Sequence, residues 1–480
     1  MKKLILILPA IIFLACEDAL VESPKSLAVE TFYNTAAEVE SAVNAIYGPL
    51  RSDNCLGGLY PAQMEAYVDY GYGRGSYGIL SEFQGLDPTN ITRTGQMWDQ
   101  FYLAIRNANL VIENAPKGSR ISEADIAKYV AEAKFLRALS YFYLVRNYGG
   151  VILRTEANMT EQSLPRSSAD DIYQLVLSDL AVAEQDLPDA PAIAGRPSKW
   201  AAKTLLADVY FYKGQYSEAR SKALEVIGSN KYSLVQVSVA DDFQKIFGPD
   251  VVSTTEEIFY LKYTRQSGYG FNLVMFAHHP GSRLHGAGGY YAHYTDSQAN
   301  PVYKNWDSAD LRKLYGWYSY DIGLGPNSLL NKKFTDPQAL GGSGAGNDYP
   351  LYRYADLLLL YAEADSRVSN GPTADGMEKL NMVRRRAYGK NPAAPSEIDL
   401  ALADYNAQSF LDRVLQERGY ETQYEGKRWL DLKRSGKAKE IIKATVGKDV
   451  ADKQFLWPIP VSELNFNTVL DATRDQNPGY

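Results

Sequence analysis

The sequence predicts an all-α fold in which pairs of helices form a scaffold and one long, loop-rich segment interrupts it. Apolar side chains recur at helical spacing over most of the chain, whereas residues 264–349 are rich in glycine and aromatic residues and show no sustained period. The residues that follow, 350–368, are apolar on nearly every side of a helix. Such a helix belongs in an interior, where other helices pack around it. We therefore expect the helical scaffold to resume at residue 350.

The totals limit the classes of protein and ligand. A chain of 480 residues with 45% hydrophobic residues is long enough to bury a large core. Its formal charge of −7 and the lack of a long basic run argue against nucleic acid as a partner. The 36 tyrosines are unusual. Because tyrosine combines an apolar face with a hydroxyl group, this composition fits both a wet core and a surface that binds sugars or proteins.

The first residues predict export and a lipid anchor. A short basic region and an apolar run too short to span a bilayer fill residues 1–15, which are predicted to be a signal peptide. This stretch ends in a sequence that resembles a bacterial lipobox, so Cys16 is the expected site of lipidation. Glu17 and Asp18 resemble the surface-export signal of Bacteroidetes-type lipoproteins. We predict a protein anchored in the outer membrane by lipid and facing the exterior, with residues 16–30 as a tether.

Several helices have recognisable starts and ends. Thr31 is a suitable cap for a helix over residues 31–51, and Gly149 and Gly150 end a helix over residues 126–147. Residues 257–263 predict a short strand. Further helices are expected at residues 96–115, 170–185, 200–228, 350–368, 375–388 and 408–419.

Residues 200–228 indicate the type of scaffold. Small and aromatic residues between Leu206 and Ala223 have the spacing of a tetratricopeptide helix–turn–helix unit. The small residues let two helices approach closely, and the aromatic residues fill the space between them. Since the other helix pairs match this template loosely, we predict about four such units. They occupy residues 31–263 and 350–440 of a single domain over residues 31–480.

Aromatic residues outside the helices are candidate ligand contacts. Scaffold residues such as Tyr210 and Tyr361 fall at helical spacing and have a packing explanation, but those in the glycine-rich segments 57–94 and 264–349 have none. Exposed aromatic side chains often bind something, and a sugar ring stacks its apolar C–H faces on them. Burial in a small core of the loops themselves is the alternative. The candidate aromatic residues are Tyr67, Tyr70, Tyr72, Tyr290, Tyr291, Trp306 and Trp317.

Trp306 is the first choice among these candidates. It offers the largest stacking face, and it lies between Asn305 and Asp307, whose polar groups suit sugar hydroxyls. We therefore expect all three residues to contact a glycan.

Residues 417–436 raise the question of catalysis. Glu417, Glu421 and Glu425 are spaced for one face of a helix, and paired carboxylates are what a glycoside hydrolase requires. Arginines and lysines occur in the same stretch, and opposite charges lower a carboxylate pKa instead of raising it. We interpret these residues as an ion-pair lattice and predict no catalytic residue.

The four histidines all fall between His278 and His293. Their spacing matches no zinc template, and no predicted helix sets them one turn apart. We predict no metal site and no cofactor, and we interpret the histidines as ligand-facing loop residues.

Several motifs in order resemble the SusD/RagB family of outer-membrane glycan-binding lipoproteins. They are RYADLLLLYAEA, ERGYETQYEGKRWLDLKRSG, the ending LWPIPVSEL…QNPGY, AEAKFLRALSYFYLVRNYGGV and the lipoprotein N-terminus. The resemblance spans the chain except for the loops, and Ile152 stands where the family usually has proline. It implies a helical, tetratricopeptide-based fold that captures oligosaccharide outside the cell, as a lid over a TonB-dependent SusC-like transporter.

Three functional hypotheses follow from these patterns. The first, which we predict, is a non-catalytic lipoprotein that captures oligo- or polysaccharide and delivers it to the transporter. The second is a tetratricopeptide-type adaptor whose only ligand is the transporter protein. The third is a secreted glycosidase. Glycan binding separates the first from the second, and hydrolysis products identify the third.

Overall fold

The computed structural model describes residues 32–340, 342 and 344–480. The predicted signal peptide, the tether with Cys16 and the expected helix cap Thr31 lie outside these residues. The described part of the chain is mostly helical, as predicted. Within it, no helix combines the length and the apolar character that a membrane span requires. The assignment to a single domain stays a prediction.

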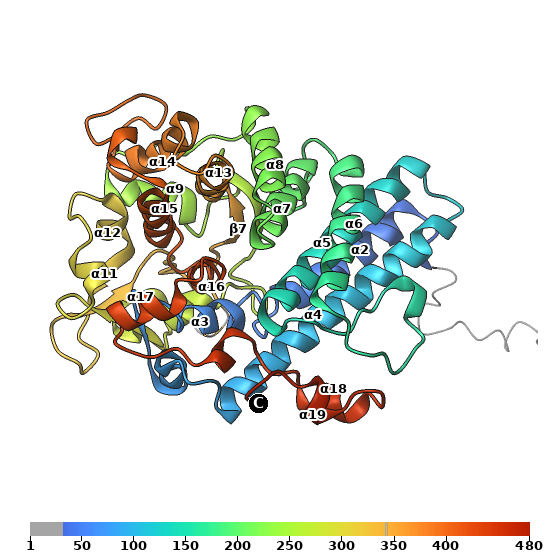
Figure 1. Cartoon of the computed structure of the whole chain (residues 1–480). Coiled ribbons are helices and arrows are strands. Elements are labelled where there is room, and N and C mark those ends of the chain that lie inside the picture. The colour runs from blue at the N-terminus through green and yellow to red at the C-terminus, as the bar shows by residue number, and fades with distance from the viewer. Residues whose placement is uncertain (1–31, 341, 343) are drawn as a thin grey trace, which may run out of the picture.

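The scaffold consists of helices that pack against their neighbours in the sequence. The bounds of these helices are α2 Ala36–Arg51, α4 Pro88–Asn114, α5 Glu123–Tyr148, α6 Ala169–Asp186, α7 Lys199–Tyr212, α8 Tyr216–Gly228, α13 Tyr354–Val368, α14 Ala374–Ala387 and α15 Ala407–Glu421. α2 packs on α4, α5 on α6, α7 on α8 and α13 on α14, in agreement with about four helix pairs. α8 also packs on α13, so the helical stack continues across the loop-rich segment (Figure 1).

Local capping explains where the scaffold helices α2 and α4 begin. α2 starts after Thr35, whose hydroxyl accepts a hydrogen bond from the Glu38 N–H while the Glu38 carboxylate accepts one from the Thr35 N–H. α4 starts at Pro88, earlier than predicted, because Asp87 caps it and proline suits the first turn. The predicted loop over residues 57–94 is therefore partly helical.

The apolar helix that follows the loop-rich segment is shorter than predicted. Residues Tyr349–Arg353 form strand β7, which pairs antiparallel with β2, Glu257–Leu261, and α13 begins only at Tyr354. At the start of α13 the Arg353 backbone N–H donates to the Asp356 carboxylate over 3.3 Å, and the Arg353 side chain joins the network of charges described below. As predicted, α13 is buried along almost its whole length.

The loop-rich segment carries short elements of its own, as expected. Strands β1, β4, β6 and β5 form one sheet in that order, and β1 belongs to the first glycine-rich segment of the chain. The antiparallel pair Tyr72–Tyr294 therefore joins two segments that are far apart in the sequence. The bounds are α3 Leu59–Met64, β1 Tyr72–Gly73, α9 Gln244–Phe247, α10 Leu273–Ala277, β3 Leu284–Ala287, β4 His293–Asp296, α11 Pro301–Lys304, α12 Leu311–Gly316, β5 Trp317–Ser319 and β6 Ser328–Asn331.

The C-terminal part of the chain returns across the scaffold. The Trp457 N–H donates to the Asn147 carbonyl over 2.7 Å, and the Trp457 ring packs edge-on against Tyr60 and Tyr148. Figure 1 shows α18 and α19 at the lower edge of the molecule, next to α4. The bounds of the last helices are α16 Arg428–Arg434, α17 Ala438–Thr445, α18 Val461–Phe466 and α19 Ala472–Asp475.

Candidate functional site

A chain of stacked side chains lies on the surface of the loop-rich segment. The Tyr291 ring is 4.1 Å from the Arg74 guanidinium carbon and 4.5 Å from the His279 ring. His279 in turn stacks on Tyr320 with 4.6 Å between ring centroids. We call the group of Tyr72, Arg74, His279, Tyr291, Tyr294 and Tyr320 the surface aromatic cluster.

The sheet brings the two ends of this cluster together. Tyr72 on β1 pairs with Tyr294 on β4, and their rings lie 5.5 Å apart. The Arg74 N–H donates to the Ala292 carbonyl over 2.7 Å and extends the same pairing. Since side chains alternate along a strand, Arg74 projects to the same side as Tyr72. None of the six side chains of the cluster is fully buried.

The backbone around Tyr291 is tightly constrained. Tyr291 has a φ of 38°, which is unusual for a residue other than glycine, and its N–H donates to the His278 carbonyl over 3.0 Å. A Cβ atom on Gly281 would lie 2.2 Å from the Tyr320 hydroxyl, and one on Gly289 would lie 2.1 Å from the His278 carbonyl oxygen. The glycines thus let the loop close onto Tyr320. A strained backbone held in place by close packing is common where a protein binds a ligand.

Three of the seven predicted aromatic residues lie at this surface. Tyr72 and Tyr291 belong to the cluster, and Tyr290, with 56% of its surface exposed, is the residue just before Tyr291. The Tyr290 ring packs at 5.5 Å on Phe276. Sequence reasoning missed Arg74, Tyr294 and Tyr320. The glycines on both sides of Arg74 were the available signal for the first of these.

The other four aromatic candidates are buried, so the expectation that they are exposed is wrong. Tyr67, Tyr70, Trp306 and Trp317 are all at most 5% exposed. Trp317 donates from its indole nitrogen to Gln423 over 2.9 Å and meets the edges of neighbouring tyrosine rings. The loops have enough aromatic residues to form a core of their own, which is the alternative that the sequence left open.

Trp306 is part of this core. Its ring stacks on Tyr420 of α15 with 4.3 Å between centroids and 6° between planes, and its indole N–H donates to Asp310 over 2.8 Å. The neighbouring Asn305 and Asp307 are exposed. Asn305 lines a separate cavity of about 330 Å³, and Asp307 accepts a hydrogen bond from the Tyr388 hydroxyl over 2.9 Å. The structure does not bring these three residues to the surface aromatic cluster.

The histidines divide into one surface residue and three buried ones. His279 belongs to the cluster, but His278, His285 and His293 are buried, so the ligand-facing interpretation is wrong for these three. A ring nitrogen of His278 hydrogen-bonds the Phe334 carbonyl and one of His293 the Ala62 carbonyl, each over 2.8 Å. Burial lowers the pKa of both side chains to about 4. Within the described ranges, no group of three or more potential ligands is placed to hold a metal ion.

The carboxylates of residues 417–436 form ion pairs, as predicted. Burial alone would raise the pKa of Glu425, but Arg353 and Lys333 beside it hold that pKa at about 2. The pKa of Glu421 is also well below its usual value, despite its burial, because three arginines surround it. A glycosidase needs one carboxyl group with a raised pKa, and neither residue provides it. The ion-pair network comprises Glu256, Arg312, Lys333, Arg353, Arg386, Glu417, Glu421 and Glu425.

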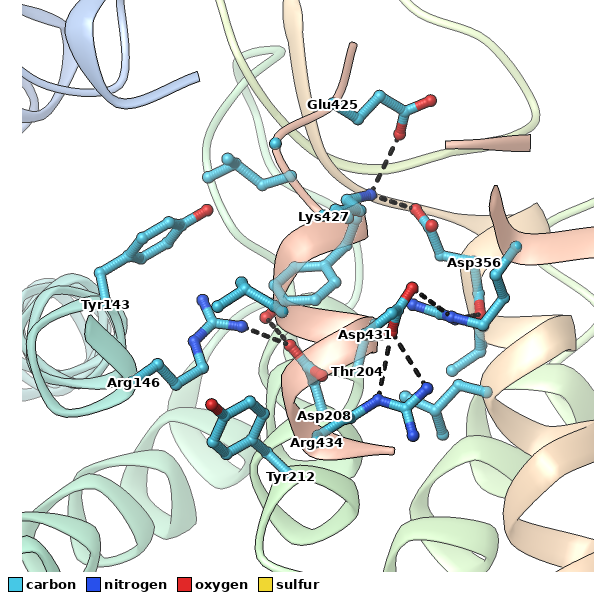
Figure 2. Close-up of a pocket in the computed structure, with 17 residues that line it drawn as sticks. Tyr143, Arg146, Thr204, Asp208, Tyr212, Asp356, Glu425, Lys427, Asp431 and Arg434 are labelled. Carbon is cyan, nitrogen blue, oxygen red and sulfur yellow. Dashed lines mark hydrogen bonds and ion pairs between the residues drawn. The ribbon is translucent and has the colours of Figure 1, made fainter. Parts of the chain in front are cut away.

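A second group of charges surrounds a cavity between the scaffold helices (Figure 2). Arg146 pairs with Asp208 over 3.5 Å, and Lys427 pairs with Asp356 over 2.5 Å. The cavity has a volume of about 50 Å³, which gives room for a few water molecules but not for a sugar. We therefore interpret it as part of the scaffold.

Two protein-family models and a SusD-like relative match this chain. The SusD family model matches residues 262–480, and a model described as "Starch-binding associating with outer membrane" matches residues 28–211. The SusD-like protein P2 of Formosa agariphila is 27% identical over 523 residues, which cover 100% of this chain and 99% of that protein.

Solved structures show the same fold. A SusD homologue from Bacteroides thetaiotaomicron superposes with a TM-score of 0.80 and 22% identity, over 94% of this chain and 98% of that one. A laminarin-binding SusD-like protein superposes with a TM-score of 0.74 and 22% identity, over 93% of this chain and 100% of that one. At this identity the superpositions establish the fold alone. The two family models, the relatives that match over the full length and the shared fold agree, and the chain belongs to the SusD family.

Proposed function

We propose that this protein is a lipoprotein of the outer membrane that holds an oligo- or polysaccharide on its surface aromatic cluster and delivers it to a TonB-dependent SusC-like transporter. The observation that carries the proposal is the cluster itself. Three segments of the chain bring four tyrosines, a histidine and an arginine together at the surface, and these side chains are not buried in the main core.

The chemistry of the cluster suits a sugar. Aromatic rings offer flat apolar faces for the C–H groups of a pyranose, and the tyrosine hydroxyls, the imidazole of His279 and the guanidinium of Arg74 offer hydrogen bonds to its hydroxyls. One of the solved structures with this fold is a laminarin-binding SusD-like protein, which supports a glycan as the ligand. Delivery to the transporter and the anchor at Cys16 are supported by the family, whose N-terminal model is described as associating with the outer membrane.

Replacement of Tyr291 tests the site. Loss of one stacking face is worth about 1–3 kcal/mol if it resembles stacking of a base on an aromatic ring. We therefore expect Tyr291→Ala to weaken glycan binding about tenfold or more, with little change in melting temperature. Affinity electrophoresis in polysaccharide gels and isothermal titration of the purified protein measure the effect.

Tyr269 provides a matched control. It is a tyrosine of the same loop-rich segment, 54% exposed, and it is not a member of the cluster. Tyr269→Ala should bind as the wild type does. Equal affinity of Tyr291→Ala and the wild type for a glycan that the protein binds would place the site elsewhere on the molecule.

A further inference from the structure

We propose that the glycan held by the surface aromatic cluster is anionic, with carboxylate or sulfate groups, and that Arg74 receives the anionic group. This inference rests on the proposed function, because it names the ligand class of the same site. It comes from the charges around the cluster and not from its rings.

Arg74 is positioned as an anion receptor. Its backbone N–H donates to the Ala292 carbonyl and so extends the sheet. One face of its guanidinium lies on the Tyr291 ring, with 4.1 Å between the guanidinium carbon and the ring centroid. Among the residues that the structure describes, no carboxylate forms an ion pair with it, and its guanidinium donates no hydrogen bond to another residue. A guanidinium stacked on a ring keeps its edge free, and that edge matches the two oxygens of a carboxylate or sulfate group.

Two further arginines near the cluster also lack an acidic partner within the described residues. Arg93 lies 4.1 Å above the Tyr77 ring and donates to the neutral side chains of Asn90 and Ser76. Arg283 is exposed in the loop that carries His279. Ser76 lies two residues after Arg74, so the Arg93 guanidinium is close to the same short segment.

Two carboxylates on the segments that carry the cluster accept hydrogen bonds from backbone N–H groups. Burial raises the pKa of Tyr294, and the charge of the neighbouring Asp296 adds to this shift. Asp296 accepts hydrogen bonds from the Gln298 and Ala299 N–H groups. Asp321, which follows Tyr320, accepts from the N–H groups of two glycines in its own turn. Neither carboxylate forms an ion pair with Arg74.

These cations without an acidic partner contrast with two arginines of the buried network. Arg312 and Arg353 each pair with two or more carboxylates, in a chain whose formal charge is −7. A neutral sugar on the cluster would displace water from Arg74 without offering an opposite charge, whereas an anionic sugar supplies one. The site is therefore better matched to an acidic glycan.

Matched pairs of polysaccharides test the ligand class. The purified full-length protein in nonionic detergent is titrated with polygalacturonate and its fully methyl-esterified form, and with a sulfated galactan and its desulfated form. Within each pair, the two polysaccharides share a backbone and differ in charge. Comparison of the two acidic polysaccharides distinguishes recognition of carboxylate from recognition of sulfate. The titrations are carried out at about 0.05 M and about 0.5 M NaCl, because added salt screens exposed charges.

We expect at least one acidic polysaccharide to bind about tenfold or more tightly than its neutral form at low salt, and this preference to shrink at high salt. Arg74→Gln should abolish the preference without a change in melting temperature. Arg106→Gln is the matched control, because it removes the same charge from α4 near Tyr33, which is not part of the cluster, and should keep the preference.

The possible failures are distinguishable. Binding of neutral and acidic forms with equal affinity, with loss of both in Tyr291→Ala, would overturn the ligand class and leave the proposed function intact. A preference for the acidic form that Arg74→Gln retains would overturn the role of Arg74. Binding to none of the four polysaccharides would count against both the ligand class and the proposed function.

Discussion

Trp306 shows how a single aromatic residue can be misassigned from sequence alone. It lies in a segment without helical period, next to two polar residues, and this pattern is equally compatible with exposure and with burial. Its partner in the structure is Tyr420, more than a hundred positions away in α15, and a local pattern contains no information on such a contact. By contrast, the ion pairs of residues 417–436 could be predicted from the mixture of charges in the stretch, although among the described residues only Asp431 pairs with arginines of that stretch and Glu421 pairs with distant ones.

The stacked geometry of Trp306 leads to a prediction about stability. Trp306→Ala would remove a buried indole ring and leave a cavity above Tyr420, at a cost of about 3–5 kcal/mol of unfolding free energy. We expect a large decrease in melting temperature, measured by calorimetry, with the affinity for a glycan nearly unchanged in the folded fraction. A normal melting temperature with impaired binding would instead support the role in ligand binding that the sequence predicts.

His293 links stability to pH. Burial lowers the pKa of His293 to about 4, below the ordinary value of about 6.5, so the unfolded chain binds a proton in this range while the folded protein does not. Its contribution to stability is therefore present above about pH 6.5 and is lost as the pH falls towards 4. His293→Gln keeps a donor for the Ala62 carbonyl but does not titrate.

We therefore expect the difference in unfolding free energy between the wild type and His293→Gln to shift in favour of the variant between about pH 6.5 and pH 4, with a slope of up to about 1.4 kcal/mol per pH unit. Denaturant titrations at several pH values measure this slope. Parallel stability curves for the two proteins would show that folding leaves the pKa of His293 at its ordinary value.

At the scale of elements, the ion-pair network holds the loop-rich segment against the scaffold. Arg353 at the end of β7 pairs with Glu421 of α15 and over 2.9 Å with Glu256 before β2, while Arg312 of α12 pairs with Glu421 over 3.0 Å. The helices of the scaffold could be predicted because their apolar period is local. The sheets could not, since β1 and β7 pair with strands that no short pattern identifies as partners.

Glu421→Gln tests this role. The change leaves Arg312, Arg353 and Arg386 buried beside a neutral amide, and loss of one partner from a buried ion pair costs about 3–5 kcal/mol. We expect a clear decrease in melting temperature and no hydrolysis products from the wild type or the variant. Glu440→Gln, which breaks the exposed pair with Lys437 on α17, should change the melting temperature little.

The prediction about Glu421 has a defined counter-result. If the purified wild-type protein released oligosaccharides from a glycan and Glu421→Gln abolished that release, these carboxylates would be catalytic after all. The lowered pKa values and the membership of a family of carbohydrate-binding proteins both point to the opposite outcome.

At the scale of the whole molecule, the chain is a helical scaffold that supports one elaborate insertion. The family, the fold and the absence of catalysis agree with the sequence-based predictions. The position of the surface aromatic cluster could be predicted only in part. Glycine-rich segments with aromatic residues indicated the region that carries this cluster, but the same segments also contain the aromatic core that supports it.

Attachment to the membrane is predicted to depend on one residue. Cys16→Ala should release the protein from the membrane fraction, because a covalently attached lipid is the only anchor that we propose. Fractionation of cells followed by immunoblotting measures the release, with a conservative change such as Ser26→Ala in the predicted tether as the control. A Cys16→Ala protein that loses its signal peptide normally and still remains with the membrane would exclude the lipid anchor.

The pairing of β1 with β4 has a consequence for the synthesis of the protein. Tyr72 and Arg74 are made early, but their neighbours Tyr291, Tyr294 and Tyr320 follow more than two hundred residues later. Contacts of such long sequence separation form late, because the chain between them must first become ordered. A nascent or truncated chain that ends before β4 can still build several helix pairs, yet it lacks Tyr294, Tyr320 and the strand pairing that completes the cluster. The complete cluster can therefore form only in a chain that has been synthesised beyond Tyr320 and has folded.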